Sequence, residues 1–247
     1  ALTKYNYSKA YSLFRPLAEK GHTEAQFNIG LMFHQGRGVE RDLGKALKWY
    51  TEAAKRGHPG AQNNIGTMYR RGSGVRRDYQ EAARWFTTAA EHHVLARNSL
   101  ALLHRYGLGV KKSNKEAARL LAWAAKDGHA KSMYDLGRLH EKGRGIKKDL
   151  GKAVEMYEQA AKGKYNRAIF TLGQFYEKGR HVPRDLKKAF GAYKQAAELK
   201  YAAAYSALGF LYLEGRGTER NPKAAAKWFR LAADNGNARG MYGLARL

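Results

Sequence analysis

Histidine is the residue type in this 247-residue sequence that most readily binds a metal ion, and nine histidines are present. His22, His58 and His129 each follow a glycine, and imidazole nitrogens are common zinc ligands. The sequence contains neither a His-Glu-x-x-His motif nor any Cys, which excludes thiolate zinc sites, disulfides and cysteine nucleophiles. The three histidines recur at one position of a long repeat, which would hold them far apart. We therefore expect no metal site.

Glycines form a second motif with chemical potential, because Gly36-Arg37-Gly38 followed by Gly44-Lys45 faintly resembles a phosphate-binding loop. Such a loop requires a preceding strand and a fixed spacing from glycine to lysine. Here a helical pattern precedes the glycines, and the same glycines recur along the chain. No Ser, His and Asp residues are spaced as a nucleophile with its base. The sequence therefore predicts a structural role for the glycines, no cofactor and no enzymatic activity.

Positive charge is a third feature, because 46 Lys and Arg residues against 21 Asp and Glu residues give a net charge of +25. This charge predicts attraction to anions without naming the anion. Apolar residues make up 44% of the chain, enough for a sizeable core. No run approaches the ~18 apolar residues of a transmembrane helix. The chain begins with Ala1, from which we expect either a removed leader or a longer native protein.

All these residues are positioned by an internal repeat that paired glycines mark. The spacings between pairs are 36, 35, 36, 36 and 36 residues, and the short interval reflects one residue missing around 91–94. The pairs are Gly36-Arg37-Gly38, Gly72-Ser73-Gly74, Gly107-Leu108-Gly109, Gly143-Arg144-Gly145, Gly179-Arg180-His181 and Gly215-Arg216-Gly217. Six residues after each first glycine stands a residue type that caps helix N-termini: Asp42, Asp78, Ser113, Asp149, Asp185 and Asn221.

Apolar and small residues at offsets of three and four indicate two helices in each repeat. In the first repeat, helix A covers roughly 24–35 and ends at a glycine, and helix B starts at Asp42 and runs to about 56. Five of the six A helices carry a mid-helix glycine such as Gly30, which costs about 1 kcal/mol relative to alanine. We therefore expect close packing against a neighbouring helix there. The third repeat differs, with Ala101 for the glycine and Leu120-Leu121 for Trp49-Tyr50.

The predicted fold class is all-α: a right-handed α/α superhelical solenoid forming a single domain over 1–247. Asn6 would cap an isolated helix B in a half-repeat at 1–21, and Gly240–Leu247 would start another helix A. Because the array begins and ends in mid-repeat, we expect further chain or another molecule to cover its ends. The expected full repeats lie near 22–57, 58–92, 93–128, 129–164, 165–200 and 201–236, with a partial repeat at 237–247.

The repeating pattern Ala…Leu-Gly-x-x-Tyr-x-x-Gly-x-Gly-Val…Asp…Lys-Ala…Trp-Tyr…Ala-Ala…Gly resembles the Sel-1-like repeat family, a relative of the tetratricopeptide repeats. The best single match is Ala25–Gly60, and the resemblance extends from Asn6 to Leu247. It implies an α/α solenoid that acts as a scaffold or adaptor for proteins or peptides. It also implies a bacterial periplasmic or secreted location, although a cytoplasmic one stays open. The absence of Cys separates this chain from the family's disulfide-bonded branch.

The A-helix side turned away from the core is the predicted docking surface, because A helices usually line the concave side of stacked helix pairs. Asn pairs with a peptide backbone through both donor and acceptor, and Arg holds a carboxylate bidentately. The predicted partner-binding residues are Phe27, Leu31, Asn63, Asn64, Arg70, Arg97, Asn98, Arg105, Tyr134, Arg138, Phe170 and Phe210. The alternative interpretation is an ordinary solvated helix face.

Basic residues of the loops between helices A and B would align into a cationic edge when the repeats stack. This edge comprises Arg37, Arg41, Arg76, Arg77, Lys111, Lys112, Arg144, Lys147, Lys148, Arg180, Arg184, Arg216 and Arg220. It would suit nucleic-acid phosphates, anionic lipid, cell-wall polymers or an acidic protein. Apart from Tyr106 the loops lack the aromatics on which single-stranded bases stack. Solubility alone is the competing explanation.

These patterns together predict a non-catalytic scaffold that binds a protein or peptide, acidic in character, through the A-helix side. The alternative is binding of nucleic acid or another polyanion through the basic edge. We expect a monomer or a component of a larger complex. The sequence does not name the partner.

Overall fold

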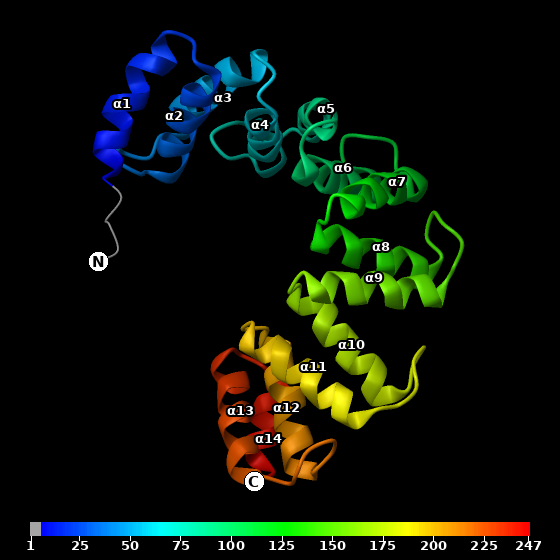
Figure 1. The fold of residues 1–247 in the computed structure, drawn as a ribbon. Coiled ribbons are helices and arrows are strands. Elements are labelled where there is room, and N and C mark those ends of the chain that lie inside the picture. Colours follow the sequence, from blue (N-terminus) through cyan, green and yellow to red (C-terminus); the bar gives the residue numbers. More distant parts are fainter. Residues whose placement is uncertain (1–5) are drawn as a thin grey trace. The chain divides into compact units, whose positions relative to one another are not determined.

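The computed structural model describes residues 6–247, and this part of the chain contains fourteen helices and no strand (Figure 1). The helices are α1 (Tyr7–Glu19), α2 (Thr23–Gln35), α3 (Leu43–Lys55), α4 (Pro59–Arg71), α5 (Tyr79–Ala90), α6 (Val94–Tyr106), α7 (Asn114–Lys126), α8 (Ala130–Lys142), α9 (Leu150–Lys162), α10 (Asn166–Lys178), α11 (Leu186–Glu198), α12 (Ala202–Glu214), α13 (Pro222–Asp234) and α14 (Ala238–Ala245). The predicted all-α repeat architecture is confirmed. Even-numbered helices are the A helices, and odd-numbered helices are the B helices.

Helix ends follow the predicted signals. Gly36 ends α2 in the left-handed conformation with φ 67°, where its backbone N–H donates to the carbonyl oxygen of Met32. Asp42 begins α3, because its Oδ1 accepts a hydrogen bond of 2.8 Å from the backbone N–H of Lys45. Asn6 caps α1 as expected. The last helix starts at Ala238, two residues before the predicted Gly240.

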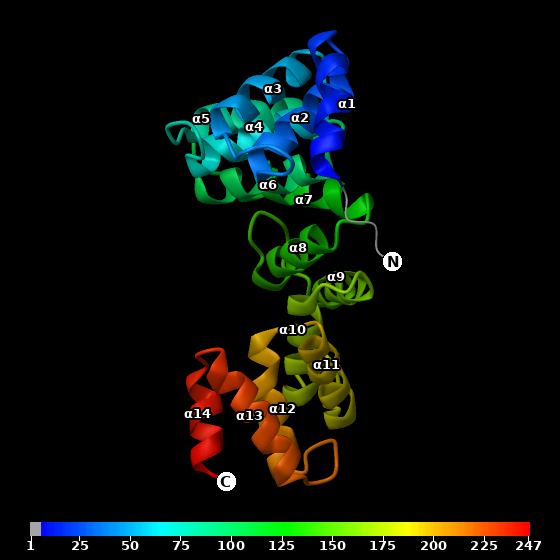
Figure 2. The same ribbon diagram turned by 90° about the vertical axis from the view of Figure 1, so that its left-hand side faces the viewer.

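The chain forms two compact units, 1–124 and 125–247. Unit 1 holds α1–α6 and most of α7, and unit 2 holds α8–α14. Within unit 2, α13 packs against both α12 and α14, and these three helices lie side by side in both ribbon views (Figures 1 and 2). In unit 1 the packed pairs run from α1 with α2 to α5 with α6, and in unit 2 they run from α8 with α9 to α13 with α14, where α12 also meets α14.

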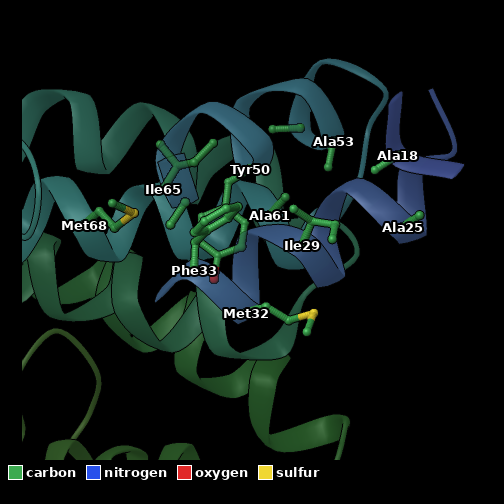
Figure 3. Close-up of a cluster of buried hydrophobic side chains, with 12 residues drawn as sticks. Ala18, Ala25, Ile29, Met32, Phe33, Tyr50, Ala53, Ala61, Ile65 and Met68 are labelled. Carbon is green, nitrogen blue, oxygen red and sulfur yellow. The ribbon is translucent and has the colours of Figure 1, made fainter. Parts of the chain in front are cut away.

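The mid-helix glycines let an aromatic ring of helix B lie against helix A. Figure 3 shows Tyr50 of α3 at the centre of the first core, between Ile29 of α2 and Ile65 of α4. A Cβ atom added at Gly30 would lie 2.6 Å from Cδ1 of Tyr50, so even alanine would collide with the ring. The expectation of close packing is thereby confirmed. The same pairing recurs as Gly66 with Phe86, Gly137 with Tyr157, Gly173 with Tyr193 and Gly209 with Phe229.

The second loop glycine joins one repeat to the next. A Cβ at Gly109 would collide with the backbone of Tyr79, the first residue of α5 in the preceding repeat. In the fifth repeat His181 occupies this position with φ 67°, which is unfavourable for a residue with a Cβ. Its ring makes an edge contact with Phe175 at 5.2 Å between centroids. The local packing therefore differs there, while the flanking helices keep their lengths.

Candidate functional site

The predicted docking residues divide into buried and half-exposed groups. Five of them are buried, with exposed fractions of 4–8%: Asn63, Arg97, Asn98, Tyr134 and Phe210. Their expected exposure on the A-helix side is wrong, because these side chains are packed inside the protein. Asn63, Asn98 and Tyr134 share one register position of the repeat, which Phe27 occupies in the first repeat. The remaining residues are half-exposed: Phe27, Leu31, Asn64, Arg70, Arg105, Arg138 and Phe170.

Arg97 stabilises a helix end from inside the protein. Its Nε donates to the carbonyl oxygen of Ala90 at 2.6 Å, and its Nη2 donates to that of Glu91 at 2.7 Å. Its guanidinium also lies 3.9 Å from the ring centroid of Trp123. Both carbonyls are at the C-terminus of α5, where four carbonyl groups lack helical partners. Arg97 therefore completes the end of α5 and does not face a partner.

The aromatic residues of this register stack between repeats. Phe27 stacks on His58 with 4.2 Å between ring centroids and lies 5.9 Å from the ring of Tyr50. Tyr134 packs in the same way between Tyr157 and Tyr165. The sequence contains a signal for these stacks, because an aromatic residue or a histidine stands immediately before most A helices. Packing between repeats therefore explains these aromatic residues of the A helices, and no ligand is needed to explain them.

Unit 1 contains polar side-chain atoms that have no hydrogen-bond partner within residues 6–124. Arg70 is half-buried, its Nε has no hydrogen-bond partner, and burial and neighbouring Arg71 lower its pKa. The Oδ1 of Asn63 and the Nδ1 of His93 are also buried without a partner. His93 stands before α6 at the position that His58 holds before α4, but only His58 accepts a capping hydrogen bond with its Nδ1. Sequence reasoning missed this correspondence because the shortened turn shifted it.

Several arginines of the predicted basic edge make contacts within the protein. The Nε atoms of Arg41, Arg184 and Arg220 donate to the carbonyl oxygens of His34, Glu177 and Leu213 at 3.2, 3.2 and 3.1 Å. In each case the arginine five residues after the glycine satisfies the C-terminus of helix A. Arg37 and Arg77 lie over the rings of Tyr7 and Tyr79 at 5.3 and 5.5 Å.

Two further edge arginines contact carboxylates in what we call the carboxylate slot, at the residue two before the loop glycine. Tyr193 donates from its hydroxyl to Oε2 of Glu177 at 2.7 Å, and Arg216 contacts Oε1 at 3.1 Å. One repeat earlier, Tyr157 donates to Glu141 at 2.8 Å, and Arg180 lies 3.7 Å from this carboxylate. A helix-B tyrosine and a loop arginine of the following repeat thus hold each glutamate.

The other edge cations are exposed and make no ion pair within the described residues. A surface cleft of about 680 Å³ lies beside two of the predicted edge residues, Arg76 and Arg77, and is also lined by Asp78, Tyr79 and Gly109. The exposed set is Arg76, Lys111, Lys112, Arg144, Lys147 and Lys148. About half of the predicted edge residues are therefore exposed and able to bind an anion. The other half make contacts within the protein.

Within residues 6–247, no helix combines the length and hydrophobicity needed to cross a bilayer. In the same range, no three His, Asp or Glu side chains gather in an arrangement that would hold a metal ion.

Comparison with known proteins identifies the family. A model of the Sel1 repeat matches seven consecutive segments: 2–22, 23–58, 59–93, 94–129, 130–165, 166–201 and 202–237. The chain belongs to the Sel1 repeat family. Sel1-repeat proteins are generally protein-interaction scaffolds and are typically non-catalytic.

Solved structures share this Sel1 fold. A Sel1 repeat protein from Oxalobacter formigenes is 32% identical with a TM-score of 0.88, over 97% of this chain and 70% of that chain. A protective antigen of uropathogenic Escherichia coli with an SLR fold is 27% identical with a TM-score of 0.88, over 95% and 50%. Mouse DAP3-binding cell death enhancer 1 is 45% identical over 42 residues, which is 17% of this chain and 8% of that protein. The chain thus matches only a small part of that curated relative.

Proposed function

We propose that this Sel1-repeat protein is a non-catalytic scaffold that binds a protein partner along the A-helix face of unit 1. We define this face by Leu31 of α2, Asn64 and Arg70 of α4, and Leu102 and Arg105 of α6. These side chains are half-exposed and lie on three successive A helices. The general scaffold role of the family supports this proposal.

Unpartnered polar atoms at and beside this face carry the proposal. Buried polar atoms are nearly always hydrogen-bonded, because leaving one unpaired costs about 1–3 kcal/mol. Among the described residues, Gln26 Oε1, Asn63 Oδ1, Arg70 Nε and His93 Nδ1 depart from this rule in unit 1, and His140 Nδ1 does so in unit 2. Peptide N–H and C=O groups of a partner would provide the complementary donors and acceptors. A bound segment would therefore be held by polar contacts, flanked by Leu31 and Leu102.

Capture of the partner from the source organism tests the proposal. The double variant Arg70→Glu with Asn64→Ala alters the face, and Lys48→Glu reverses an equal charge on the exposed side of α3. We expect the double variant to lose a protein that the unchanged chain and the Lys48 variant retain, as measured by quantitative mass spectrometry of eluates. Retention of every captured protein by the double variant would contradict the proposal.

A second candidate function is polyanion binding by the exposed edge cations. The cleft beside Arg76 and Arg77 and the free lysine pair Lys111-Lys112 favour it. Affinity for a polyanion falls linearly with salt on a logarithmic scale, with a slope near the number of phosphates neutralised. We expect a labelled oligonucleotide to lose affinity when Lys111 and Lys112 are changed to Gln. Unchanged affinity would exclude this edge as the binding surface.

A further inference from the structure

A pocket of about 260 Å³ lies between α1 and α2 in unit 1. Ala10 and Phe14 of α1 line its apolar part together with Leu31 and Met32 of α2, and the two helices lie side by side (Figures 1 and 2). Small-molecule sites usually measure about 300–1,000 Å³. This pocket therefore suits one side chain of a partner and is small for a cofactor.

The ring of Phe14 is less covered than its counterparts in later repeats. Tyr50, Phe86 and Phe229 stand at the same register position and are completely buried. The A helix that precedes each of them lies against its ring through a mid-helix glycine. Phe14 is half-buried, and within residues 6–247 no helix precedes α1. An apolar side chain bound in the pocket would remove this aromatic surface from water, which favours binding.

A cation stands at the rim of the pocket. The guanidinium of Arg37 lies 5.3 Å from the ring centroid of Tyr7, and both residues line the pocket. Arg37 is exposed, and within the described residues it forms no ion pair. Arg216 stands at the same register position in unit 2, where it contacts the carboxylate of Glu177 at 3.1 Å. A carboxylate is therefore the group that Arg37 is placed to bind.

Two amide side chains of α2 add hydrogen-bonding groups to the pocket. Nδ2 of Asn28 donates to the backbone carbonyl oxygen and to Oε1 of Glu24, at 2.8 and 3.2 Å. Its Oδ1 is left to accept a hydrogen bond, and the exposed side chain of Gln35 makes none within the described residues. An amide pairs with a peptide backbone through its carbonyl oxygen and its NH₂ group. These groups suit the main chain of a bound segment.

We propose that this pocket binds an apolar side chain of about the size of leucine from an acidic segment of the partner, and that Arg37 binds a neighbouring carboxylate of that segment. The inference rests on the proposed function, because Leu31 belongs both to the pocket and to the A-helix face. Successive residues of an extended segment are about 3.3 Å apart, so an acid one or two residues from the apolar one reaches the rim. The net charge of +25 also favours an acidic segment.

NMR of methyl-labelled methionine tests this inference at the pocket itself. Met32 lines the pocket, whereas Met133, Met156 and Met241 belong to unit 2. The probe is the peptide acetyl-Gly-Ser-Glu-Leu-Glu-Ser-Gly-amide. We expect it to shift the Met32 resonance saturably and to leave those of unit 2 unchanged. Replacing its Leu by Ala should weaken binding about tenfold, and replacing both Glu by Gln should weaken it about threefold.

Two loop arginines provide matched variants. Arg37→Gln should weaken probe binding about threefold. Arg144→Gln removes the same charge from an exposed residue at the same register position in unit 2, and should change binding less than about 1.5-fold. An unshifted Met32 resonance, or equal losses in the two variants, would overturn the inference.

Filling the pocket tests it without removing a charge. Ala10→Met should retain the helical circular dichroism of the unchanged chain and weaken probe binding about tenfold, because the longer side chain occupies the apolar part. Unweakened binding by a folded Ala10→Met protein would also overturn the inference. Tighter binding of acetyl-Gly-Ser-Gly-Ser-Leu, whose only carboxylate is its chain end, would overturn the acidic segment in favour of a C-terminus.

Competition separates this inference from the proposed function. If the captured partner depends on Arg70 and Asn64 but is not displaced by the probe, the pocket proposal is wrong and the scaffold face stands. If the probe shifts Met32 and depends on Arg37 but no captured protein depends on the face, the scaffold proposal fails and the pocket chemistry stands.

Discussion

The ring of Tyr50 packs directly on Gly30, with only 2.6 Å available between its Cδ1 and any Cβ at residue 30. Tyr50 is completely buried, so its ring fills the space between α2, α3 and α4. In the third repeat both members of this pair change, to Ala101 and Leu121, and both are buried. A larger residue on helix A thus accompanies a smaller one on helix B.

A paired substitution tests this relationship. Gly30→Ala should destabilise the protein by about 1–3 kcal/mol, because the added methyl group forces the ring out of position. Adding Tyr50→Leu to the variant should recover part of the loss, since the third repeat combines the same residues. Urea unfolding of the wild type, both single variants and the double variant gives the coupling energy. Strictly additive effects would show that the two residues do not share one packing position.

The repeat, the helix boundaries and the glycine–aromatic packing were predictable from sequence, because they depend on residue type at fixed register. Asp42 starts a helix through its own capping side chain. Gly36 ends one because it has no side chain and adopts the left-handed conformation. Side-chain exposure was not predictable in the same way. Asn63 and Asn98 have polar side chains at an A-helix position for which the sequence pattern predicts exposure. Their burial depends on how closely the following repeat approaches.

Arg97 provides a prediction about stability instead of binding. Arg97→Met should lower the free energy of unfolding by about 2–4 kcal/mol, because two carbonyls at the end of α5 lose a charged donor. Arg84→Met should change it by less than about 1 kcal/mol, since the exposed Arg84 pairs with Glu81 on the surface. Thermal and urea unfolding of both variants measures the difference. Similar losses from the two substitutions would show that the buried contacts of Arg97 add little.

Charge at the loop edge illustrates the other limit of sequence reasoning. Arg180 and Arg216 look the same in sequence as Arg37 and Arg144, since all four follow the first loop glycine. Only the structure shows that Arg216 contacts Glu177, which lies 39 residues away in the chain. Register alone identifies a row of cations, but the acids that neutralise some of them come from another repeat.

Backbone strain at the end of α11 leads to a stabilising substitution. Lys200 has φ 58° at the position that Gly57 occupies with φ 83° after α3. Because glycine adopts this conformation without a steric penalty, Lys200→Gly should stabilise the protein by about 0.5–1 kcal/mol. Gly57→Ala should destabilise it by about 1 kcal/mol through the backbone alone, since no heavy atom lies within 4 Å of the added Cβ. The midpoints of urea unfolding report both changes, and a shift of equal sign in the two variants would contradict the argument.

Half-buried histidines make stability depend on pH. The pKa of His93 is lowered first by burial and then by nearby His58 and Arg97, so the folded protein favours the neutral ring. As pH falls below about 6.5, the unfolded chain gains a proton that folded His93 does not yet accept. Unfolding therefore becomes easier, by up to about 1.4 kcal/mol per pH unit for each such histidine until the lowered pKa is reached.

Urea unfolding at about pH 7.5 and about pH 5.5 measures this loss of stability. His93→Gln should reduce the difference between the two pH values, because glutamine does not titrate. His22→Gln is the matched control, since His22 is exposed in the equivalent turn and should leave the difference unchanged. His34 and His129, whose pKa values burial also lowers, should account for part of the remainder. If His93→Gln retains the full pH dependence of the wild type, His93 is protonated equally in the folded and unfolded chains.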